Sequence, residues 1–388
     1  MPDIEFMRLA LRLARRGYGR TSPNPLVGAV LVRNGEVIGQ GWHCRAGAPH
    51  AEIEALHDTE RRGEHPEGAT LYVTLEPCST QGRTPPCTDA IRAARIKRVV
   101  VAAIDPNPRH AGRGIHILRR HGIKVDRGVL GEEAAELNEA YNHWVVRRTP
   151  FVTVKAAMSL DGKIASAGGE SKWITGGISR AAAMKLRQGA DAILVGINTI
   201  LADDPRLTIR TRLTDGRRQT GKPFHRIILD SRARIPLWAR VIADDQKART
   251  IIVVGRSAPK RRVAALARRA NVWVAPSCDG KIDLRRLLKR LGAEGVSSLL
   301  VEGGGEVNAS FLLGGFSHRI VFFYAPIILG GRDSKKAAGG NGARRLEELL
   351  RLREGRWRRL GPDLLLTART GPREPIRSQA ERRRAACR

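Results

Sequence analysis

The stretch TLEPCSTQGRTPPC (residues 74–87) decides which kind of site the first part of the chain is predicted to contain. It is taken together with His50-Ala51-Glu52, which lies upstream of it. It supplies two thiols, Cys78 and Cys87, and His50 adds an imidazole, which are all side chains that bind Zn²⁺. Three protein ligands leave the fourth tetrahedral position for water, as in catalytic zinc sites. Bound zinc lowers the pKa of that water to roughly 7. We therefore predict a catalytic zinc site, one ion per chain, held by His50, Cys78 and Cys87.

Glu52 is the predicted catalytic residue of this site. It lies two residues after His50, where it can take a proton from the water and deliver it to a leaving amine. Zinc nucleobase deaminases divide the labour in this way, with the Glu as proton shuttle and not as ligand. The other three cysteines, Cys44, Cys278 and Cys387, lack neighbours of ligand type.

Strand-like and helix-like segments alternate on both sides of this motif, which is typical of α/β domains. We expect a first α/β domain over residues 1–146 and a second one over residues 150–370, with a mostly parallel sheet flanked by helices. Residues 371–388 contain six Arg and no apolar pattern, so we expect a basic disordered tail. The expected strands lie at residues 26–33, 69–75, 98–104, 151–157, 190–196, 226–229, 250–254, 297–301 and 319–325.

The net charge of +31 over 388 residues raises the question of nucleic acid. The charge is uneven, because residues 1–145 carry a net +3 and residues 146–388 a net +28. Binders of single-stranded nucleic acid interleave aromatic side chains with their charge, but aromatic residues are only 4% of this chain. Since 56 of the 69 basic residues are Arg, we interpret the surplus as Arg-rich surface composition. Electrostatic steering of anionic ligands is a secondary hypothesis, which a salt-independent association rate would remove.

Cysteine content and hydropathy indicate the compartment. Five cysteines is a low and odd count, which favours a reducing cytoplasm over a disulfide framework. No apolar run approaches the roughly 20 residues needed to cross a bilayer, so we expect no membrane partner.

The eight residues between Cys78 and Cys87 set this chain apart from deaminases of nucleic-acid bases, which typically show Pro-Cys-x-x-Cys. With its long second cysteine element, the sequence resembles the bifunctional deaminase–reductases of riboflavin biosynthesis. The resemblance covers about 365 of the 388 residues. It is carried in the first half by TSPNPLVGAVLV (21–32), AGAPHAEIEAL (46–56) and DPNPRHAGRG (105–114). In the second half it is carried by KAAMSLDGKIA (155–165), GESKWIT (169–175), INTILADDPRLTIR (197–210), LDSRARIP (229–236) and VEGGGEVNASFL (301–312).

The resemblance implies a cytidine-deaminase-like domain followed by a dihydrofolate-reductase-like domain. The implied reactions are zinc-dependent hydrolytic deamination of 2,5-diamino-6-(5-phosphoribosylamino)pyrimidin-4-one, then reduction of its ribosyl group to ribityl with NADPH. A homo-oligomer, dimer or tetramer, is implied as well.

In the deaminase domain the resemblance implies five contacts to substrate. Asn24, Asp105 and Asn107 are expected at the heterocycle, and His43 and Arg83 at the phosphate. The run Asp105-Pro106-Asn107-Pro108 is equally typical of a plain turn, and the two roles can coexist. Thr80 stands where the family commonly has His, which puts one substrate contact in doubt and leaves the predicted zinc ligands intact.

In the reductase domain the Gly triplet 303–305 lies between a strand and a helix-like segment, where backbone N–H groups can approach a phosphate. Taken alone, such a triplet is also typical of a tight turn. The run Asp203-Asp204-Pro205 is equally typical of a turn that ends a helix. Family position implies substrate contacts at Ser171, Arg187, Leu207, Arg210 and Glu302. The guanidinium groups of Arg187 and Arg210 are expected at the substrate phosphate, whose geometry they match. It implies NADPH contacts at Ala157, Trp173, Thr199, Asp203, Ser231, Gly303, Gly304 and Gly305.

Two other functions fit parts of the sequence. A tRNA or DNA base deaminase with a basic accessory domain is disfavoured by the nearly neutral first half and the long cysteine gap. A nucleic-acid-binding protein with structural zinc is disfavoured because a closed structural site needs four protein ligands.

Overall fold

The structure is a computed structural model that describes residues 2–81, 85–209, 224–278 and 280–371. The chain divides into two compact units. The first runs to residue 151 and also includes residues 289–298, and the second contains most of the remainder. Arg83, Arg210 and the expected tail beyond Gly371 lie outside the described residues.

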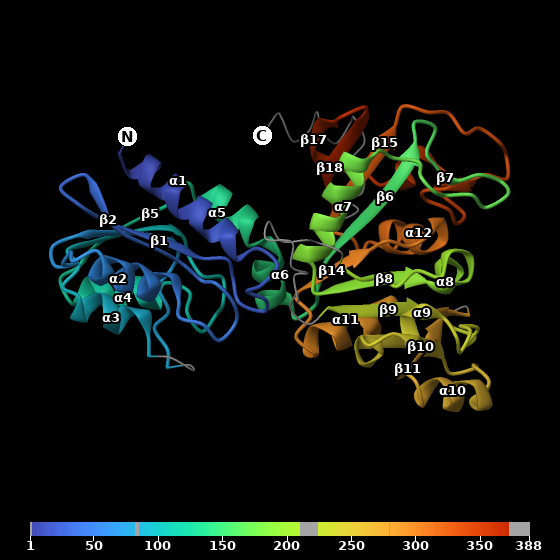
Figure 1. The fold of residues 1–388 in the computed structure, drawn as a ribbon, viewed down its shortest axis with the longest axis horizontal. Coiled ribbons are helices and arrows are strands. Elements are labelled where there is room, and N and C mark those ends of the chain that lie inside the picture. The colour runs from blue at the N-terminus through green and yellow to red at the C-terminus, as the bar shows by residue number, and fades with distance from the viewer. Residues whose placement is uncertain (1, 82–84, 210–223, 279, 372–388) are drawn as a thin grey trace, which may run out of the picture. The chain divides into compact units, whose positions relative to one another are not determined.

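The first unit contains a five-stranded sheet of order β2-β1-β3-β4-β5 (Figure 1). Strands β2, β1 and β3 pair antiparallel, whereas β3, β4 and β5 pair parallel. The β1–β2 hairpin turns at Asn34 and Gly35, which have φ of 53° and 83°, as a type I′ turn requires. The elements are α1 (Pro2–Ala14), η1 (Arg15–Gly17), β1 (Gly28–Arg33), β2 (Glu36–Trp42), α2 (Ala51–Arg61), β3 (Thr70–Leu75), α3 (Cys87–Ala93), β4 (Arg98–Ala103), α4 (Arg113–Arg120), β5 (Lys124–Arg127), α5 (Gly131–Leu137) and α6 (Glu139–Arg147).

Helices cover both faces of this sheet, because its central strands are apolar on both sides. Along β1, Ala29 and Leu31 pack with α2, α3 and α4, whereas Val30 and Val32 pack with α1 and α5. Figure 1 shows the same two layers, with α1 and α5 on one side of the sheet and α2, α3 and α4 on the other. This arrangement leaves the carboxyl ends of β3 and β4 free for chemistry.

The second unit contains a nine-stranded sheet of order β11-β10-β9-β8-β14-β6-β15-β18-β17. Parallel pairing joins β11 to β10, β10 to β9 and β9 to β8, as expected. It also joins β8 to β14 and β6 to β15. The main strands are β6 (Phe151–Ser159), β8 (Ala192–Gly196), β9 (His225–Leu229), β10 (Thr250–Gly255), β11 (Asn271–Ala275), β14 (Ser298–Val301), β15 (Arg319–Ala325), β17 (Leu352–Leu360) and β18 (Asp363–Thr370). Short strands are β7 (Lys163–Ala165), β12 (Ser277–Cys278), β13 (Lys281–Ile282) and β16 (Lys335–Lys336).

The antiparallel β17–β18 hairpin was not predicted. Residues 352–359 of β17 are all exposed, and the strand is rich in Arg, so its sequence lacks the apolar alternation by which strands are recognised.

The largest core of the second unit lies around β8, β9 and β10. Ile193, Ile228 and Ile252 are fully buried there and pack with residues of α8, α9 and α10. The helices of the unit are α7 (Gly177–Gly189), α8 (Ile197–Asp203), α9 (Arg240–Ala243), α10 (Lys260–Ala267), α11 (Leu284–Ala293) and α12 (Gly305–Leu313), with 3₁₀ turns η2 (Lys247–Arg249) and η3 (Leu346–Glu348). The described helices are all too short or too polar to span a bilayer.

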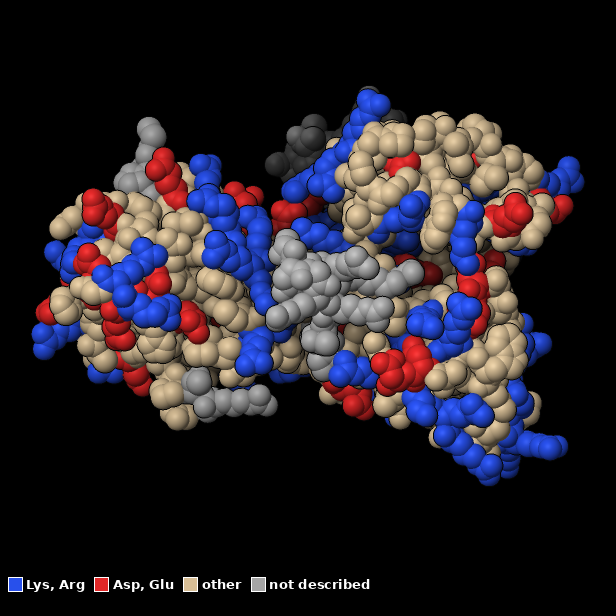
Figure 2. Space-filling model, in the orientation of Figure 1, with Lys and Arg blue, Asp and Glu red and all other residues tan. Residues whose placement is uncertain are grey.

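Basic side chains are scattered over the second unit. Figure 2 shows Lys and Arg spread over its visible face, with a group around α10 at the lower right and no continuous stripe. This distribution agrees with the interpretation of the charge as general surface composition.

A polar network fastens α1 to the sheet of the first unit. The Asp3 carboxylate accepts two hydrogen bonds from Arg98, at 3.0 and 2.8 Å, and one from Tyr72 Oη at 2.6 Å. The Arg98 hydrogen bonds lower the pKa of Asp3 to about 2.

We predict that Asp3→Asn destabilises the first unit by about 1 kcal/mol, the low end for charge-assisted bonds, because the side chains of Asp3 and Arg98 are about a third exposed. The folded-state pKa of Asp3 is depressed, so this contribution is present above pH 4 and is lost between about pH 4 and 2. Urea unfolding followed by far-UV circular dichroism measures the loss at neutral pH, and the same measurement at lower pH follows it into acid. Asp89→Asn, which removes an exposed pair with Arg92, is the control and should change stability by less than about 0.5 kcal/mol. Equal losses in the two variants would contradict the account.

Candidate active sites

Three separate elements bring the predicted zinc ligands together. His50 is the residue before α2, Cys78 follows the end of β3, and Cys87 is the first residue of α3. His50 Nδ1 lies 3.2 Å from Cys87 Sγ and 3.5 Å from Cys78 Sγ, and the three ligand atoms all lie within 4.8 Å of one another. This is the only such group of metal-ligating side chains that the described part of the chain contains.

The donor set fits zinc in both chemistry and spacing. With Zn–S of about 2.3 Å and Zn–N of about 2.0 Å, tetrahedral angles place the donor atoms about 3.5–3.8 Å apart. The two N···S distances, 3.2 and 3.5 Å, are close to that range. Three ligands leave one position open, as a catalytic site requires.

The surroundings favour the thiolate form of Cys78. A hydrogen bond from Cys87 lowers the pKa of the Cys78 thiol. The backbone N–H of Cys87, at the start of α3, also points at Cys78 Sγ, 3.3 Å away. A helix N-terminus stabilises negative charge and lowers thiol pKa values.

Glu52 lies in the first turn of α2 and is 3% exposed. Burial raises its pKa to about 7, and the negative charge of Cys78 adds to the effect. A carboxyl group with a pKa near the working pH can both accept and donate a proton. Its position and its environment therefore suit the predicted shuttle.

Asn24 and His43 form a pair beside the ligands. Asn24 Nδ2 lies 3.1 Å from His43 Nε2, and His43 Nδ1 lies 3.0 Å from the Pro49 carbonyl oxygen. His43 also meets the His50 ring edge-on, with the ring centres 5.6 Å apart. Burial lowers the pKa of His43, so its ring is neutral.

The expected phosphate contact of His43 stays a prediction. Both of its ring nitrogens have protein partners in this structure, the Asn24 amide and the Pro49 carbonyl oxygen. We interpret His43 as the residue that orients the Asn24 amide.

Asp105 and Asn107 form the turn that the sequence left open as an alternative. Asp105 Oδ1 accepts a hydrogen bond from Asn107 N at 2.9 Å, and Asn107 Oδ1 accepts one from Arg109 N at 3.1 Å. Tyr141 donates to both carboxylate oxygens of Asp105. Burial raises the pKa of Asp105. The turn directly follows β4, at the same sheet edge as Cys78, whereas Thr80 is exposed.

The second unit contains a buried cluster of three charges. Glu302 follows β14 and receives two hydrogen bonds of 2.8 Å from Nε and Nη2 of Arg187, on α7. Lys155 Nζ, on β6, lies 3.6 Å from its carboxylate. Burial alone would raise the pKa of Glu302, but Lys155 and Arg187 hold it at about 2. Glu302 is thus an anion at neutral pH.

Arg187 is less available to phosphate than its family position implies. Two of its three nitrogens face Glu302, and the third, Nη1, lies 3.4 Å from the Thr208 carbonyl oxygen. A phosphate can reach only the Nη1 edge without breaking the bidentate pair.

The glycine triplet fits a bound dinucleotide phosphate. Gly304 precedes α12, and a Cβ added to it would meet nothing within 4 Å, so the space in front of the helix is open. The first N–H groups of a helix have no partner within it and bind phosphate well. At Gly303 and Gly305 a Cβ would instead clash with Val307 and with the Lys336 carbonyl oxygen, so these two glycines allow close packing.

Three of the predicted cofactor segments follow neighbouring parallel strands. Thr199 lies in α8 after β8, Ser231 follows β9, and the glycine triplet follows β14. Because β9, β8 and β14 are adjacent, their carboxyl ends meet at one sheet edge, where α/β sheets bind ligands.

The other expected contacts are dispersed around this unit. Trp173 is 66% exposed, with Arg180 stacked on its ring at 4.8 Å. Asp203 pairs with Lys172 at 3.2 Å. The side chain of Leu207 is buried in the main core, so only its backbone can face a ligand. The remaining two, Ala157 on β6 and Ser171, are half-buried.

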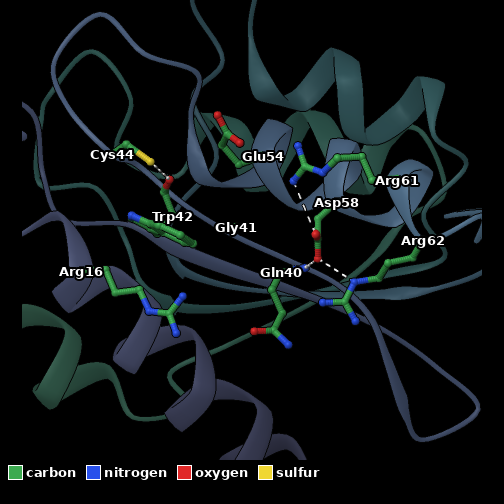
Figure 3. A pocket seen from close by; sticks show the side chains of 9 residues that line it. All are labelled: Arg16, Gln40, Gly41, Trp42, Cys44, Glu54, Asp58, Arg61 and Arg62. Carbon is green, nitrogen blue, oxygen red and sulfur yellow. Dashed lines mark hydrogen bonds and ion pairs between the residues drawn. The ribbon is translucent and has the colours of Figure 1, made fainter. Parts of the chain in front are cut away.

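A hollow of about 260 Å³ in the first unit lies at the outer edge of β2 (Figure 3). Asp58 there accepts hydrogen bonds from the backbone N–H of Gln40 and from Arg62. An edge strand whose backbone N–H is already hydrogen-bonded to a side chain is less able to pair with a strand of another chain. None of the predicted site residues lines this hollow.

Comparison with known proteins supports both units. Residues 1–103 match the cytidine and deoxycytidylate deaminase zinc-binding region, and residues 150–366 match the RibD C-terminal domain. The riboflavin biosynthesis protein RibD of Aquifex aeolicus is 45% identical, over 94% of this chain and 97% of its own. The Escherichia coli RibD is 37% identical, over 94% and 99%.

The chain belongs to the RibD family.

Solved RibD structures agree over the whole fold. The Acinetobacter baumannii RibD superposes with a TM-score of 0.84 at 34% identity, covering 96% of this chain and 99% of that one. A Thermotoga maritima deaminase/reductase gives a TM-score of 0.81 at 34% identity, covering 95% and 99%. This RibD chain is a bifunctional enzyme of riboflavin biosynthesis, with a zinc-binding cytidine-deaminase-like domain and a reductase domain that uses NADPH. The expected family, fold class and cofactors are thereby confirmed.

Sequence reasoning did not settle the role of Lys155 and did not single out Tyr141. Lys155 is the one charged residue in the middle of a largely apolar strand, which is a signal for a buried charge that needs a partner. Tyr141 gives no local signal, because its partner Asp105 is 36 residues away.

We predict that Glu302→Gln lowers kcat/KM of the reductase about 10- to 100-fold, because Lys155 and Arg187 lose their shared anion. The rate of NADPH oxidation with the deaminated pyrimidine as substrate measures this kcat/KM. Deamination by the same variant reports that the chain is folded and should stay within twofold of wild type. Glu347→Gln, at an exposed carboxylate of the same unit, is the control. Unchanged reduction by Glu302→Gln would contradict a role for the cluster.

Proposed function

We propose that the first unit hydrolyses the 2-amino group of 2,5-diamino-6-(5-phosphoribosylamino)pyrimidin-4-one. The observation that carries this proposal is the meeting of His50, Cys78 and Cys87 beside the buried Glu52. The Thermotoga maritima relative is described as a diaminohydroxyphosphoribosylaminopyrimidine deaminase/5-amino-6-(5-phosphoribosylamino)uracil reductase, which supports the choice of substrate.

In this reaction His50, Cys78 and Cys87 would hold zinc, which when bound would lower the pKa of a water molecule and so supply a nucleophile at neutral pH. The Glu52 carboxylate takes a proton from the attacking water and passes it to the departing nitrogen. The water oxygen bonds to C2 of the ring, the C2–N bond breaks, and ammonia leaves. Asn24, oriented by His43, has an amide oxygen and one N–H left to bind the edge of the heterocycle. The Asp105–Asn107 turn, at the end of β4, contacts the same heterocycle.

We propose that the second unit then reduces the ribosyl group of the deaminated product to ribityl. NADPH, when bound, supplies the hydride that reaches C1′. The open N-terminus of α12 at Gly304 binds a cofactor phosphate, and Thr199 and Ser231 contribute from the neighbouring strand ends. Glu302, held ionised by Lys155 and Arg187, accepts hydrogen bonds from sugar hydroxyls and orients the sugar.

We further propose the domain limits 1–146 and 150–370, a cytoplasmic location and a homo-oligomeric assembly with no nucleic-acid partner. The low cysteine count supports the location. The low content of aromatic residues, which stack on bases in nucleic-acid binders, supports the absence of a nucleic-acid partner. The assembly rests on family resemblance, and a monomeric mass in light scattering would exclude it.

We predict that Glu52→Gln lowers the deamination rate at least about 100-fold, since the amide cannot carry the proton. The variant should keep one zinc per chain, measured by elemental analysis, and should still reduce the deaminated pyrimidine at the wild-type rate. Glu54→Gln is the matched control, since Glu54 lies in the same helical turn but lines the hollow at β2. Loss of zinc from Glu52→Gln would show that Glu52 is a ligand and not the shuttle.

A further inference from the structure

Glu76 is a buried carboxylate that neither reaction uses directly. It comes directly after β3 and two residues before Cys78, and it is 5% exposed. Its oxygens accept four backbone hydrogen bonds, all from one segment. Oε2 receives the N–H of Gly112 at 2.9 Å and of Asp105 at 3.3 Å, and Oε1 receives those of Gly114 at 2.9 Å and Ile115 at 3.3 Å.

These four bonds span the whole segment from β4 to α4. One donor is at Asp105, where the turn with Asn107 begins, and the other three surround the start of α4. The Glu76 carboxylate thus takes the place of an N-terminal capping group, which α4 lacks in its own sequence. One side chain therefore fixes both ends of the segment.

Backbone packing makes the same connection. A Cβ on Gly114 would lie 2.2 Å from the Pro77 carbonyl oxygen, so the start of α4 rests directly on the residue before Cys78. The backbone N–H of Glu76 also donates to the Ala103 carbonyl oxygen at 2.9 Å, which extends the β3–β4 pairing by one bond. The substrate-facing turn and the zinc-ligand loop are joined at Glu76.

We propose that Glu76 is a positioning residue for deamination, which holds the Asp105–Asn107 turn at a fixed place relative to the zinc ligands. This inference rests on the proposed deaminase function. The glutamate side chain suits the four donors because each of its two oxygens accepts two of their hydrogen bonds. A glutamine would turn an NH₂ group toward two backbone N–H groups and leave them without partners.

The test compares Glu76→Gln, Glu76→Asp and the exposed control Glu67→Gln by steady-state deamination, with zinc content and reductase activity measured on each protein. We expect Glu76→Gln to raise KM about tenfold and to change kcat less than about threefold, because the zinc ligands and Glu52 stay in place. Glu76→Asp, which keeps the charge, should recover part of the loss. Zinc content and reduction should match wild type, and Glu67→Gln should match it in every measurement.

A double variant separates positioning from a merely structural role. If Glu76 acts through the turn, adding Glu76→Gln to Asn107→Ala should raise KM no more than about twofold over Asn107→Ala alone. Additive effects, an unchanged KM in Glu76→Gln, loss of zinc, or an aspartate no better than the glutamine would each overturn the inference. A wild-type protein without deaminase activity would instead defeat the proposed function, so the two failures can be told apart.

Discussion

Parallel pairing forces the carboxyl ends of neighbouring strands to the same edge of a sheet, and the proposed site residues of both units lie there. In the first unit β3 leads into Glu76 and Cys78, and β4 leads into Asp105. In the second unit β14 leads into Glu302 and the glycine triplet, with the ends of β8 and β9 beside it. Residues far apart in sequence therefore meet without long loops, and helices that begin at the same edge add their N–H groups.

Each proposed site also contains a buried glutamate beside its reacting groups, Glu52 in the first unit and Glu302 in the second, and the surroundings give the two opposite properties. Glu52 is buried beside the thiolate of Cys78, so its pKa rises to about 7 and it can exchange a proton. Glu302 is buried between Lys155 and Arg187, so its pKa falls to about 2 and it stays an anion. In the proposed reactions the same side chain serves as a proton carrier in one unit and as a fixed charge in the other, because desolvation dominates its pKa in one and ion pairing in the other.

Much of this arrangement could be predicted from local sequence. The zinc ligands were recognisable because few residue types bind zinc, and the strand before Cys78 and the Asn34-Gly35 hairpin have strong local patterns. Pairings between distant residues could not be predicted, such as Arg187 with Glu302 or His43 with Asn24, because no local signal joins them. The β17–β18 hairpin was missed because exposed Arg residues hide its strand pattern.

The central claim is that two independent sites act in order on one pyrimidine, with deamination first. The most direct measurement is the mass of the products formed from the diaminopyrimidinone substrate by the purified protein, with and without NADPH. Without NADPH the account predicts a product in which one amino group has been replaced by oxygen. With NADPH the same product should gain two hydrogens. A product that carries both hydrogens and the original amino group, or no turnover until NADPH is added, would contradict the account.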